Sequence, residues 1–183
     1  MSAEARPAVL RTERLLLRPF VQGDEEDVFA YARLEEWSRY HLPQIPYPYA
    51  RSDADEFIAS MLETSWEDEA NWAIVIDERV VGGLTLSLRP PASRAELGYS
   101  LAPHQWNRGI TTEAARAVLD YAFYVWGLDT VEARADARNV GSWRVMEKVG
   151  MRRTTLAAGT RADRTGALVD EVHYRIGRET WLR

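Results

Sequence analysis

Apolar and polar positions follow one another along the chain in patterns that predict strands and helices in a fixed order. A short apolar run around Leu16 stops at Pro19 and predicts a first strand. Two helices are expected next, with Asp24 and Ser52 as N-caps, on either side of a proline-rich irregular loop at 41–49. Three antiparallel strands follow, with turns at 78–79 and 90–93, at Trp72–Asp77, Val80–Leu88 and Ala95–Leu101.

The second half of the chain has a different pattern. A helical period of apolar residues covers Thr112–Trp126. A strand at Val131–Ala135, a short helix at Ser142–Val149 and a strand at Val172–Ile176 complete the order. The chain is therefore expected to be a mixed α/β (α+β) protein, with an antiparallel meander followed by a βαβ-type half. The pair Gly82-Gly83 in the meander predicts a bulge or a close approach of two backbones.

Composition narrows the classes of protein to consider. The 183 residues suit a single domain spanning 1–183, and 46% hydrophobic with 28% charged residues is typical of a globular protein. The formal net charge of −5 argues against binding nucleic acid through bulk electrostatics. Without cysteine, a disulfide framework, a thiolate nucleophile and a cysteine-based zinc site are excluded. No apolar run approaches the roughly 20 residues of a membrane span, and the N-terminus lacks a signal-peptide pattern, so a cytoplasmic protein without membrane contact is expected.

A polar loop with one glycine joins the third meander strand to the long helix. It reads Trp106-Asn107-Arg108-Gly109-Ile110-Thr111-Thr112-Glu113. A loop of this kind directs several backbone N–H groups toward one point, and the positive helix end adds to their attraction for a phosphate. The alternative is an ordinary strand-to-helix turn with Thr111 or Thr112 as N-cap. Neither the Walker A pattern nor the G-x-G-x-x-G fingerprint is present.

The loop resembles the acyl-CoA pyrophosphate loop of the GNAT superfamily of N-acetyltransferases. Its flanks are similar to those of the RimJ/RimL-like group, the ribosomal-protein N-terminal acetyltransferases: Glu96–Leu101 precedes the loop and Thr112-Glu113-Ala114 follows it. A second element of that group, N-x-x-S running into E-K-x-G, is matched by Asn139–Ser142 and Glu147–Met151. The opening segment, Leu10–Pro19, also resembles the first strand of the group.

The resemblance implies the GNAT acyl-CoA N-acyltransferase fold and acetyl-CoA as cosubstrate, with no metal. Thr111 departs from the glycine or alanine of the motif, and its β-branched side chain requires a negative φ. Trp106 and Asn107 are further departures. The residues implied to hold the cofactor are Leu101, Trp106, Asn107, Arg108, Gly109, Ile110, Thr111, Thr112, Asn139 and Ser142.

Acetyl transfer to an amine needs a neutral amine, stabilisation of the thioester oxygen and help for the departing thiolate. We predict Glu96 as the general base, directly or through water, and a backbone N–H near Leu101 as the oxyanion donor. A solvated Glu96, or one paired with an arginine such as Arg94, is the alternative. Because Met146 stands where many GNAT enzymes have a tyrosine acid, the group implies Ser142 near the sulfur. The alternative is an N-cap or first-turn role for Ser142 and an N-cap role for Asn139.

These features predict an N-acetyltransferase that transfers the acetyl group directly to a primary amine, either a peptide N-terminus or a small molecule. The alternative is a non-catalytic acyl-CoA-binding sensor, although Glu96 and Ser142 together favour catalysis. His41, His104 and His173 show no metal-ligand spacing, and only His173 is expected on a strand that could face the site. The family often forms dimers, so a homodimer is one expected assembly.

Overall fold

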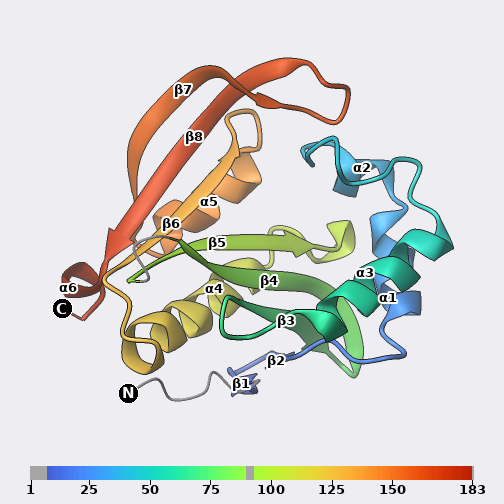
Figure 1. Cartoon of the computed structure of the whole chain (residues 1–183), viewed down its shortest axis with the longest axis horizontal. Coiled ribbons are helices and arrows are strands. Elements are labelled where there is room, and N and C mark those ends of the chain that lie inside the picture. The colour runs from blue at the N-terminus through green and yellow to red at the C-terminus, as the bar shows by residue number, and fades with distance from the viewer. Residues whose placement is uncertain (1–7, 90–92, 183) are drawn as a thin grey trace.

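The computed structural model describes residues 8–89 and 93–182, so most of the predicted turn at 90–93 lies outside the described residues. All strands join one mixed sheet in the order β1-β2-β3-β4-β5-β6-β8-β7 (Figure 1). The pairings are antiparallel except that of β5 with β6, which is parallel and connected through a helix. The strands are β1 Leu10–Arg11, β2 Leu16–Arg18, β3 Glu69–Ile76, β4 Arg79–Arg89, β5 Arg94–Leu101, β6 Thr130–Asp136, β7 Arg152–Ala162 and β8 Leu168–Gly177.

The helices follow the strands along the chain largely in the order that the apolar periodicity predicted. The long predicted helix is an α-helix that continues into one π-helical segment. The helical segments are α1 Glu25–Ala32, α2 Glu35–Ser38, α3 Arg51–Glu63, the 3-10 turn η1 Pro103–Gln105, α4 Ile110–Asp120, the π segment η2 Tyr121–Val125, α5 Val140–Lys148 and α6 Arg178–Trp181. The order of a meander followed by a βαβ-type half is confirmed.

The two predicted helix caps have different outcomes. Asp24 is the N-cap residue of α1, as predicted, but its side chain makes no cap hydrogen bond, because its carboxylate binds the guanidinium of Arg18 at 2.7 and 2.8 Å. Ser52 lies inside α3, which starts one residue earlier, and the Asp53 carboxylate accepts a hydrogen bond from the Ala50 N–H at 2.6 Å. In both cases an ionised carboxylate forms a hydrogen bond with a group that the residue pattern around the helix start does not indicate.

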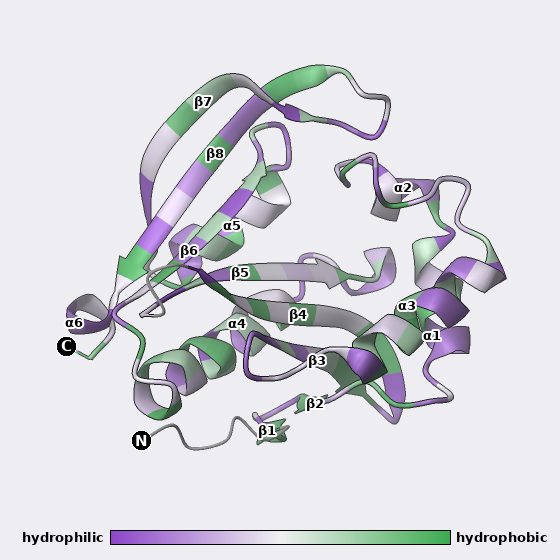
Figure 2. Cartoon of the chain, viewed as in Figure 1, coloured by the Kyte–Doolittle hydropathy of each residue, from purple (hydrophilic) through white to green (hydrophobic). Residues whose placement is uncertain are grey.

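Helices cover the two faces of the sheet unequally. The face that carries Trp72 packs against α4 and η2, where Trp72 meets Tyr121 edge to face with ring centroids 5.4 Å apart. On the other face the ring of Phe20 packs on the ring of Phe57 of α3, with centroids 5.3 Å apart, near β4. Toward β8 this second face becomes polar, and β8 itself alternates between hydrophilic and hydrophobic residues (Figure 2).

The β7–β8 hairpin extends beyond the rest of the sheet and its tip reaches α2 (Figure 1). Arg164, in the turn of this hairpin, donates to the Ser38 hydroxyl at 2.7 Å and to the Glu35 carboxylate at 3.1 Å. Its guanidinium also lies 4.3 Å from the ring centroid of Tyr47. β7 is not among the predicted strands, because its residues are mostly exposed on both faces and show no apolar alternation.

The glycine pair in β4 marks a close approach of two backbones, as predicted. A Cβ on Gly82 would lie 2.4 Å from the carbonyl oxygen of Ser100 on β5. The ladder between β3 and β4 also shifts register at Ile74 and Val75, opposite this position. A side chain at position 82 would therefore force β4 and β5 apart.

Replacing Gly82 with alanine should destabilise the protein by roughly 1–3 kcal/mol, because the methyl group has no room against β5. Urea unfolding measures the change. Gly98→Ala is the matched control, since a Cβ there meets only Thr85 at 4.0 Å. Equal stability of the two variants would contradict the close approach.

Candidate active site

The central strands β5 and β6 separate partway along their length. β5 pairs with β4 throughout, but with β6 only as far as Glu96↔Glu132. We call the opening beyond this pair, between residues 97–101 of β5 and 133–136 of β6, the fork. No described strand pairs with the edge of β5 that faces the fork.

Backbone groups of β5 point into the fork. The Ala102 N–H donates to Val81 of β4 at 2.7 Å. Because successive residues of a strand direct their backbone groups to opposite sides, Leu101 directs its N–H and carbonyl into the fork. That carbonyl accepts the indole N–H of Trp106 at 2.8 Å. The predicted oxyanion donor, the Leu101 N–H, thus lies on the open side of the strand.

Glu96 lies at the closed end of the fork and is held by two arginines. Its carboxylate accepts hydrogen bonds from Arg134 at 2.6 and 3.3 Å and from Arg89 at 3.3 Å. Arg94, the arginine suggested by the sequence, pairs instead with Glu132 at 3.6 Å. Arg134 comes from β6, so its contact with Glu96 ties the two sides of the fork together.

A tyrosine and a serine meet on the opposite, helix-covered face of the fork. The Tyr99 hydroxyl donates to the Ser142 carbonyl at 2.8 Å, and the Ser142 hydroxyl donates to Tyr99 at 3.2 Å. Burial raises the pKa of Tyr99, so its hydroxyl stays protonated at neutral pH. Tyr99 was not among the predicted site residues. Its place in the segment 96–101, on the same face as the apolar residues Leu97 and Leu101, could have indicated a role at the site.

Asn139 supports this arrangement as the N-cap of α5. Its side-chain oxygen accepts a hydrogen bond from the Ser142 N–H at 3.2 Å. The N-cap alternative for Asn139 is therefore confirmed, and it fixes the backbone of Ser142 relative to β5. Met146, which stands in place of the tyrosine acid, is 1% exposed and belongs to the core.

The loop after β5 adopts two left-handed backbone conformations. Asn107 has a φ of +60° and Gly109 a φ of +76°. Asparagine and glycine are the residues that accept this region most readily. Thr111 lies within the first turn of α4 and is not among the positive-φ residues, as expected for a β-branched side chain.

The first turn of α4 offers free backbone donors. Gly109 is its N-cap and no side chain caps the helix, so the alternative of an N-cap at Thr111 or Thr112 is wrong. The Glu113 N–H bonds to Gly109 at 3.0 Å, and the N–H groups of residues 110–112 precede the first intrahelical bonds. Donors at a positive helix end suit a phosphate group.

Glu113 anchors this helix start to the N-terminal strands. Its carboxylate accepts hydrogen bonds from the Thr12 hydroxyl at 2.5 Å, from the Arg14 N–H at 3.0 Å and from the Arg14 guanidinium at 2.6 Å. Desolvation raises the pKa of Glu113, but these hydrogen bonds outweigh it and lower the pKa. Arg14 also donates to the Arg108 carbonyl at 3.0 Å, which holds the loop in place.

A groove of about 670 Å³ opens beside the loop, between the N-terminal segment and α4. Gly109 and Thr112 line it together with four cations and three carboxylates, one of which, Glu113, is paired with Arg14. The four cations are Arg11, Arg14, Arg116 and Lys148. The groove therefore adds positive charge next to the free donors of α4.

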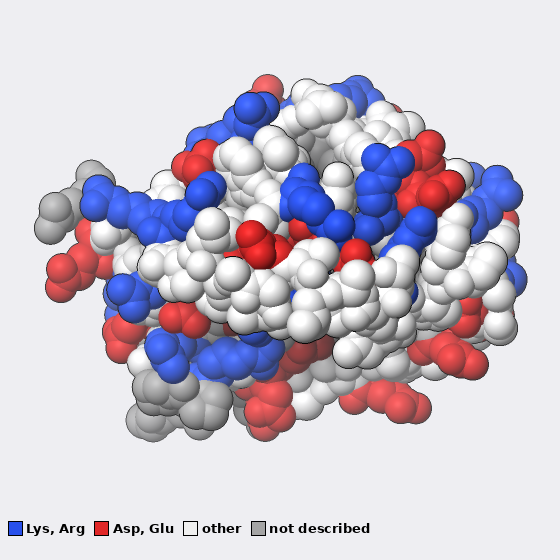
Figure 3. Space-filling view, turned by 90° about the horizontal axis from the view of Figure 1, so that it is seen from above, with Lys and Arg blue, Asp and Glu red and all other residues white. Residues whose placement is uncertain are grey.

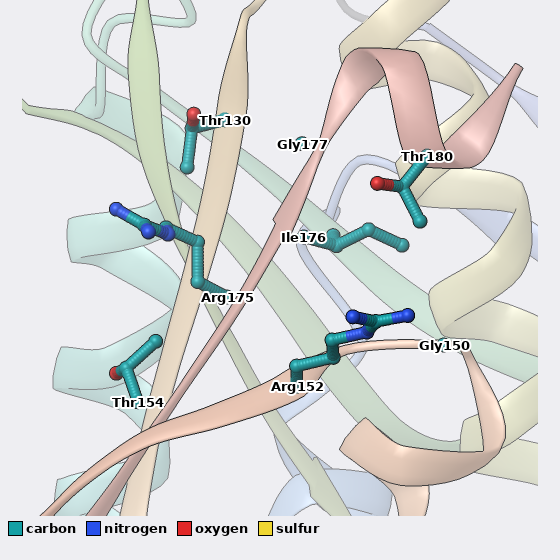
Figure 4. A pocket seen from close by; sticks show the side chains of 8 residues that line it. All are labelled: Thr130, Gly150, Arg152, Thr154, Arg175, Ile176, Gly177 and Thr180. Carbon is teal, nitrogen blue, oxygen red and sulfur yellow. The ribbon is translucent and has the colours of Figure 1, made fainter.

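A second hollow, of about 330 Å³, lies at the closed end of the β5–β6 pairing, where β6, β8 and α6 meet. Arg152 and Arg175 line it, but Figure 4 shows their guanidinium groups pointing in opposite directions. They do not converge on one ligand, and this hollow is not part of the site.

The histidines have separate environments. His41 stacks on Trp37 with ring centroids 3.9 Å apart, and burial lowers its pKa to about 4, so it is neutral at pH 7 and part of the packing. His104 is exposed in η1. His173 lies on the same face of the sheet as Glu96, 2.8 Å from the Glu171 carboxylate.

Charge on the surface is mixed. Acidic and basic side chains alternate across the middle of the face seen in Figure 3. Among the described residues, no group of three or more histidine, aspartate and glutamate side chains could hold a metal ion. Within the same residues, no helix has the length and apolar character needed to cross a membrane.

Comparison with known proteins identifies the family. Residues 14–152 match the acetyltransferase (GNAT) domain. The chain belongs to the GNAT acetyltransferase family. It is 26% identical to the uncharacterized N-acetyltransferase YnaD of Bacillus subtilis (strain 168), over 94% of this chain and 98% of that protein.

Solved GNAT structures have the same fold. A GNAT-family acetyltransferase from Bacillus anthracis superposes with a TM-score of 0.83 at 27% identity, covering 94% of this chain and 99% of that one. RimJ of Mycobacterium smegmatis, solved in complex with CoA-disulfide, superposes with a TM-score of 0.81 at 22% identity, covering 96% and 90%. The chain is thus an acetyl-CoA-dependent N-acetyltransferase of the GNAT type.

Replacing Gly109 with glutamate should abolish acetyl-CoA binding, because the new carboxylate would face the phosphates and the backbone would leave its left-handed conformation. Calorimetric titration measures the affinity. Gly166→Glu is the matched control, since Gly166 has a φ of +83° in the β7–β8 turn with open space around it. Wild-type affinity in the Gly109 variant would contradict a phosphate site at this loop.

Proposed function

We propose that the enzyme transfers the acetyl group directly to a primary amine that approaches the charged face of the sheet, while acetyl-CoA approaches from the helix-covered face. The fork is the observation that carries this proposal. Ser142 and Tyr99 lie on its helix side, and Glu96 lies on its charged side. Two substrates can therefore meet in one gap without an acyl-enzyme, in keeping with the absence of cysteine.

The residues that hold acetyl-CoA in this proposal follow from the geometry of the loop and of β5. The loop from Trp106 to Thr112 receives the pyrophosphate on free N–H groups, with Arg108 and the groove cations nearby. The open edge of β5 binds the pantetheine arm through backbone hydrogen bonds, as it would bind an added strand. The Leu101 N–H stabilises the thioester oxygen, and Asn139 holds Ser142 close to the sulfur.

The proposed acceptor is a peptide N-terminus or a small primary amine. An α-amine titrates near 8 and a lysine amine near 10.4, so an α-amine supplies the neutral nucleophile more readily at neutral pH. The fold likeness to RimJ supports placing the enzyme in the RimJ/RimL-like group. Glu96, with its negative charge at the fork, is proposed to attract the amine and to help remove its proton through water.

An acceptor screen tests this function. Purified enzyme and acetyl-CoA are incubated with N-terminal peptides, polyamines, amino acids and aminoglycosides, and products are detected by mass spectrometry. Addition of one acetyl group to an amine, with release of free CoA thiol, is the expected result. Tight acetyl-CoA binding without transfer to any amine would favour a non-catalytic acyl-CoA sensor instead.

Replacing Ser142 with alanine should lower kcat by roughly ten- to a hundredfold, the effect of losing one hydrogen bond to a developing charge. Acetyl-CoA affinity should change little, because the loop supplies the phosphate contacts. Steady-state kinetics and calorimetry measure the two effects. Ser60→Ala, on the outer surface of α3, is the control. An unchanged kcat would remove Ser142 from the mechanism.

Replacing Glu96 with glutamine should lower kcat/KM by roughly a hundredfold, because the side chain keeps its shape but loses its charge. Glu132→Gln removes the same charge from the neighbouring strand, at a residue paired with Arg94, and should have a much smaller effect. If the two variants lost activity equally, the charge of the whole face rather than Glu96 itself would be responsible.

A further inference from the structure

Glu96 is better placed to bind a positively charged group than to accept a proton. A carboxylate that takes up a proton loses its charge, and Glu96 would then lose its ion pairs with Arg134 at 2.6 Å and Arg89 at 3.3 Å. The proton that leaves the amine therefore needs a second acceptor on the same face.

His173 lies on the same face as Glu96, with strand β6 between their two strands, β5 and β8. Arg134, which bonds Glu96, is the cross-strand partner of His173 between β6 and β8. Val172 and Tyr174, the neighbours of His173 along β8, are each 1% exposed and point to the other face. The His173 side chain is 34% exposed, so it is accessible to water and to a bound acceptor.

Glu171 and His173 form a carboxylate–imidazole pair. The Glu171 side chain is 10% exposed, and its Oε2 lies 2.8 Å from His173 Nε2. Its Oε1 accepts a hydrogen bond from Arg161 at 2.9 Å. Desolvation raises the pKa of Glu171, but the hydrogen bonds from Arg161 and His173 and the charge of Arg134 outweigh it and lower the pKa. The carboxylate is therefore ionised at neutral pH and accepts the hydrogen on Nε2.

This pairing fixes which imidazole nitrogen is basic. When Nε2 carries the hydrogen, Nδ1 holds the lone pair. No group in the described part of the chain bonds to Nδ1 of His173. The arrangement has the logic of a hydrolase triad, in which a carboxylate orients an imidazole so that its other nitrogen receives a proton.

We propose that His173 accepts the proton of the acceptor amine and that Glu171 is the residue that positions it, an inference that rests on the proposed function. As the nitrogen of a neutral amine bonds to the acetyl carbon and the carbon–sulfur bond breaks, one proton passes from that nitrogen through water to Nδ1. The sulfur leaves with its bonding electron pair and takes one proton from solvent beside Ser142. His173 then returns its proton to solvent, so each turnover gives one amide and one thiol.

Imidazole suits this task, because it can accept and release a proton near neutral pH. The charged groups on its face are Glu171 and Arg175 on its own strand, Arg134 on β6 and Arg161 on β7. The activity should rise with pH through the range in which His173 loses its proton.

The pH dependence of kcat/KM tests the proposal. His173→Gln should lower kcat/KM roughly a hundredfold at pH 7 and remove the rising limb of the pH profile. Glu171→Gln should move that limb to lower pH, because a negative partner no longer stabilises the imidazolium. Glu96→Gln should lower the rate but keep the limb. Added imidazole should restore part of the activity of His173→Ala, which a merely structural role would not allow.

Arg175→Gln is the control, because Arg175 lies on the same face of the same strand two residues further on; its profile should match the wild type. A His173→Gln enzyme with the wild-type rate and the wild-type rise of kcat/KM with pH would overturn the role of His173 while leaving the proposed function intact. A wild-type enzyme that binds acetyl-CoA and acetylates no amine would overturn both.

The tautomer of His173 gives a second test that needs no acceptor. Nitrogen-15 NMR of the wild-type protein above pH 8, with the signals assigned through His173→Gln, should show the hydrogen on Nε2 and a bare Nδ1. A hydrogen on Nδ1 would overturn the proposal whatever the activity.

Discussion

The end of hydrogen bonding between β5 and β6 is the constraint on which the rest of the site depends. Every backbone N–H and carbonyl needs a partner, and an unpaired strand edge in the middle of a sheet leaves a row of them open to ligand or water. The ladder stops at Glu96↔Glu132, so this row faces a gap between two strands rather than the outer edge of the sheet. An extended ligand arm can add there as a strand does.

Side chains connect the two sides of the gap and give its two faces different chemistry. Arg134 reaches from β6 to Glu96 on the charged face, and Tyr99 reaches from β5 to Ser142 on the helix face. The helix face leads to the free donors and cations at the start of α4, which suit phosphates. The charged face presents paired carboxylates and His173, which suit an amine. A chain with a net charge of −5 can thus still present local donors and cations that suit an anion.

Features governed by local backbone preferences could be predicted from the sequence. The glycine of the loop, the Asn139 cap and the close approach at Gly82 depend on residue type at one position, and the structure has all three. The order of strands and helices followed from apolar periodicity in the same way.

Features that depend on distant residues could not be predicted. Arg134 is 38 residues from Glu96, and Tyr99 is 43 residues from Ser142, so neither contact has a local pattern. The β7 strand was not predicted because both of its faces are largely exposed. The start of α4 was predicted at the wrong residue because no side chain caps the helix. Glu171 and His173, two residues apart on one strand, could have been placed on one face by alternation, but not brought into contact.

Amide hydrogen exchange with and without acetyl-CoA tests the central claim most directly, because it reports on the backbone groups of the fork and the loop. Acetyl-CoA binding should slow exchange in residues 97–101 of β5 and in residues 107–112 of the loop and α4. Unchanged exchange in both segments, with protection only around the hollow lined by Arg152 and Arg175, would contradict it.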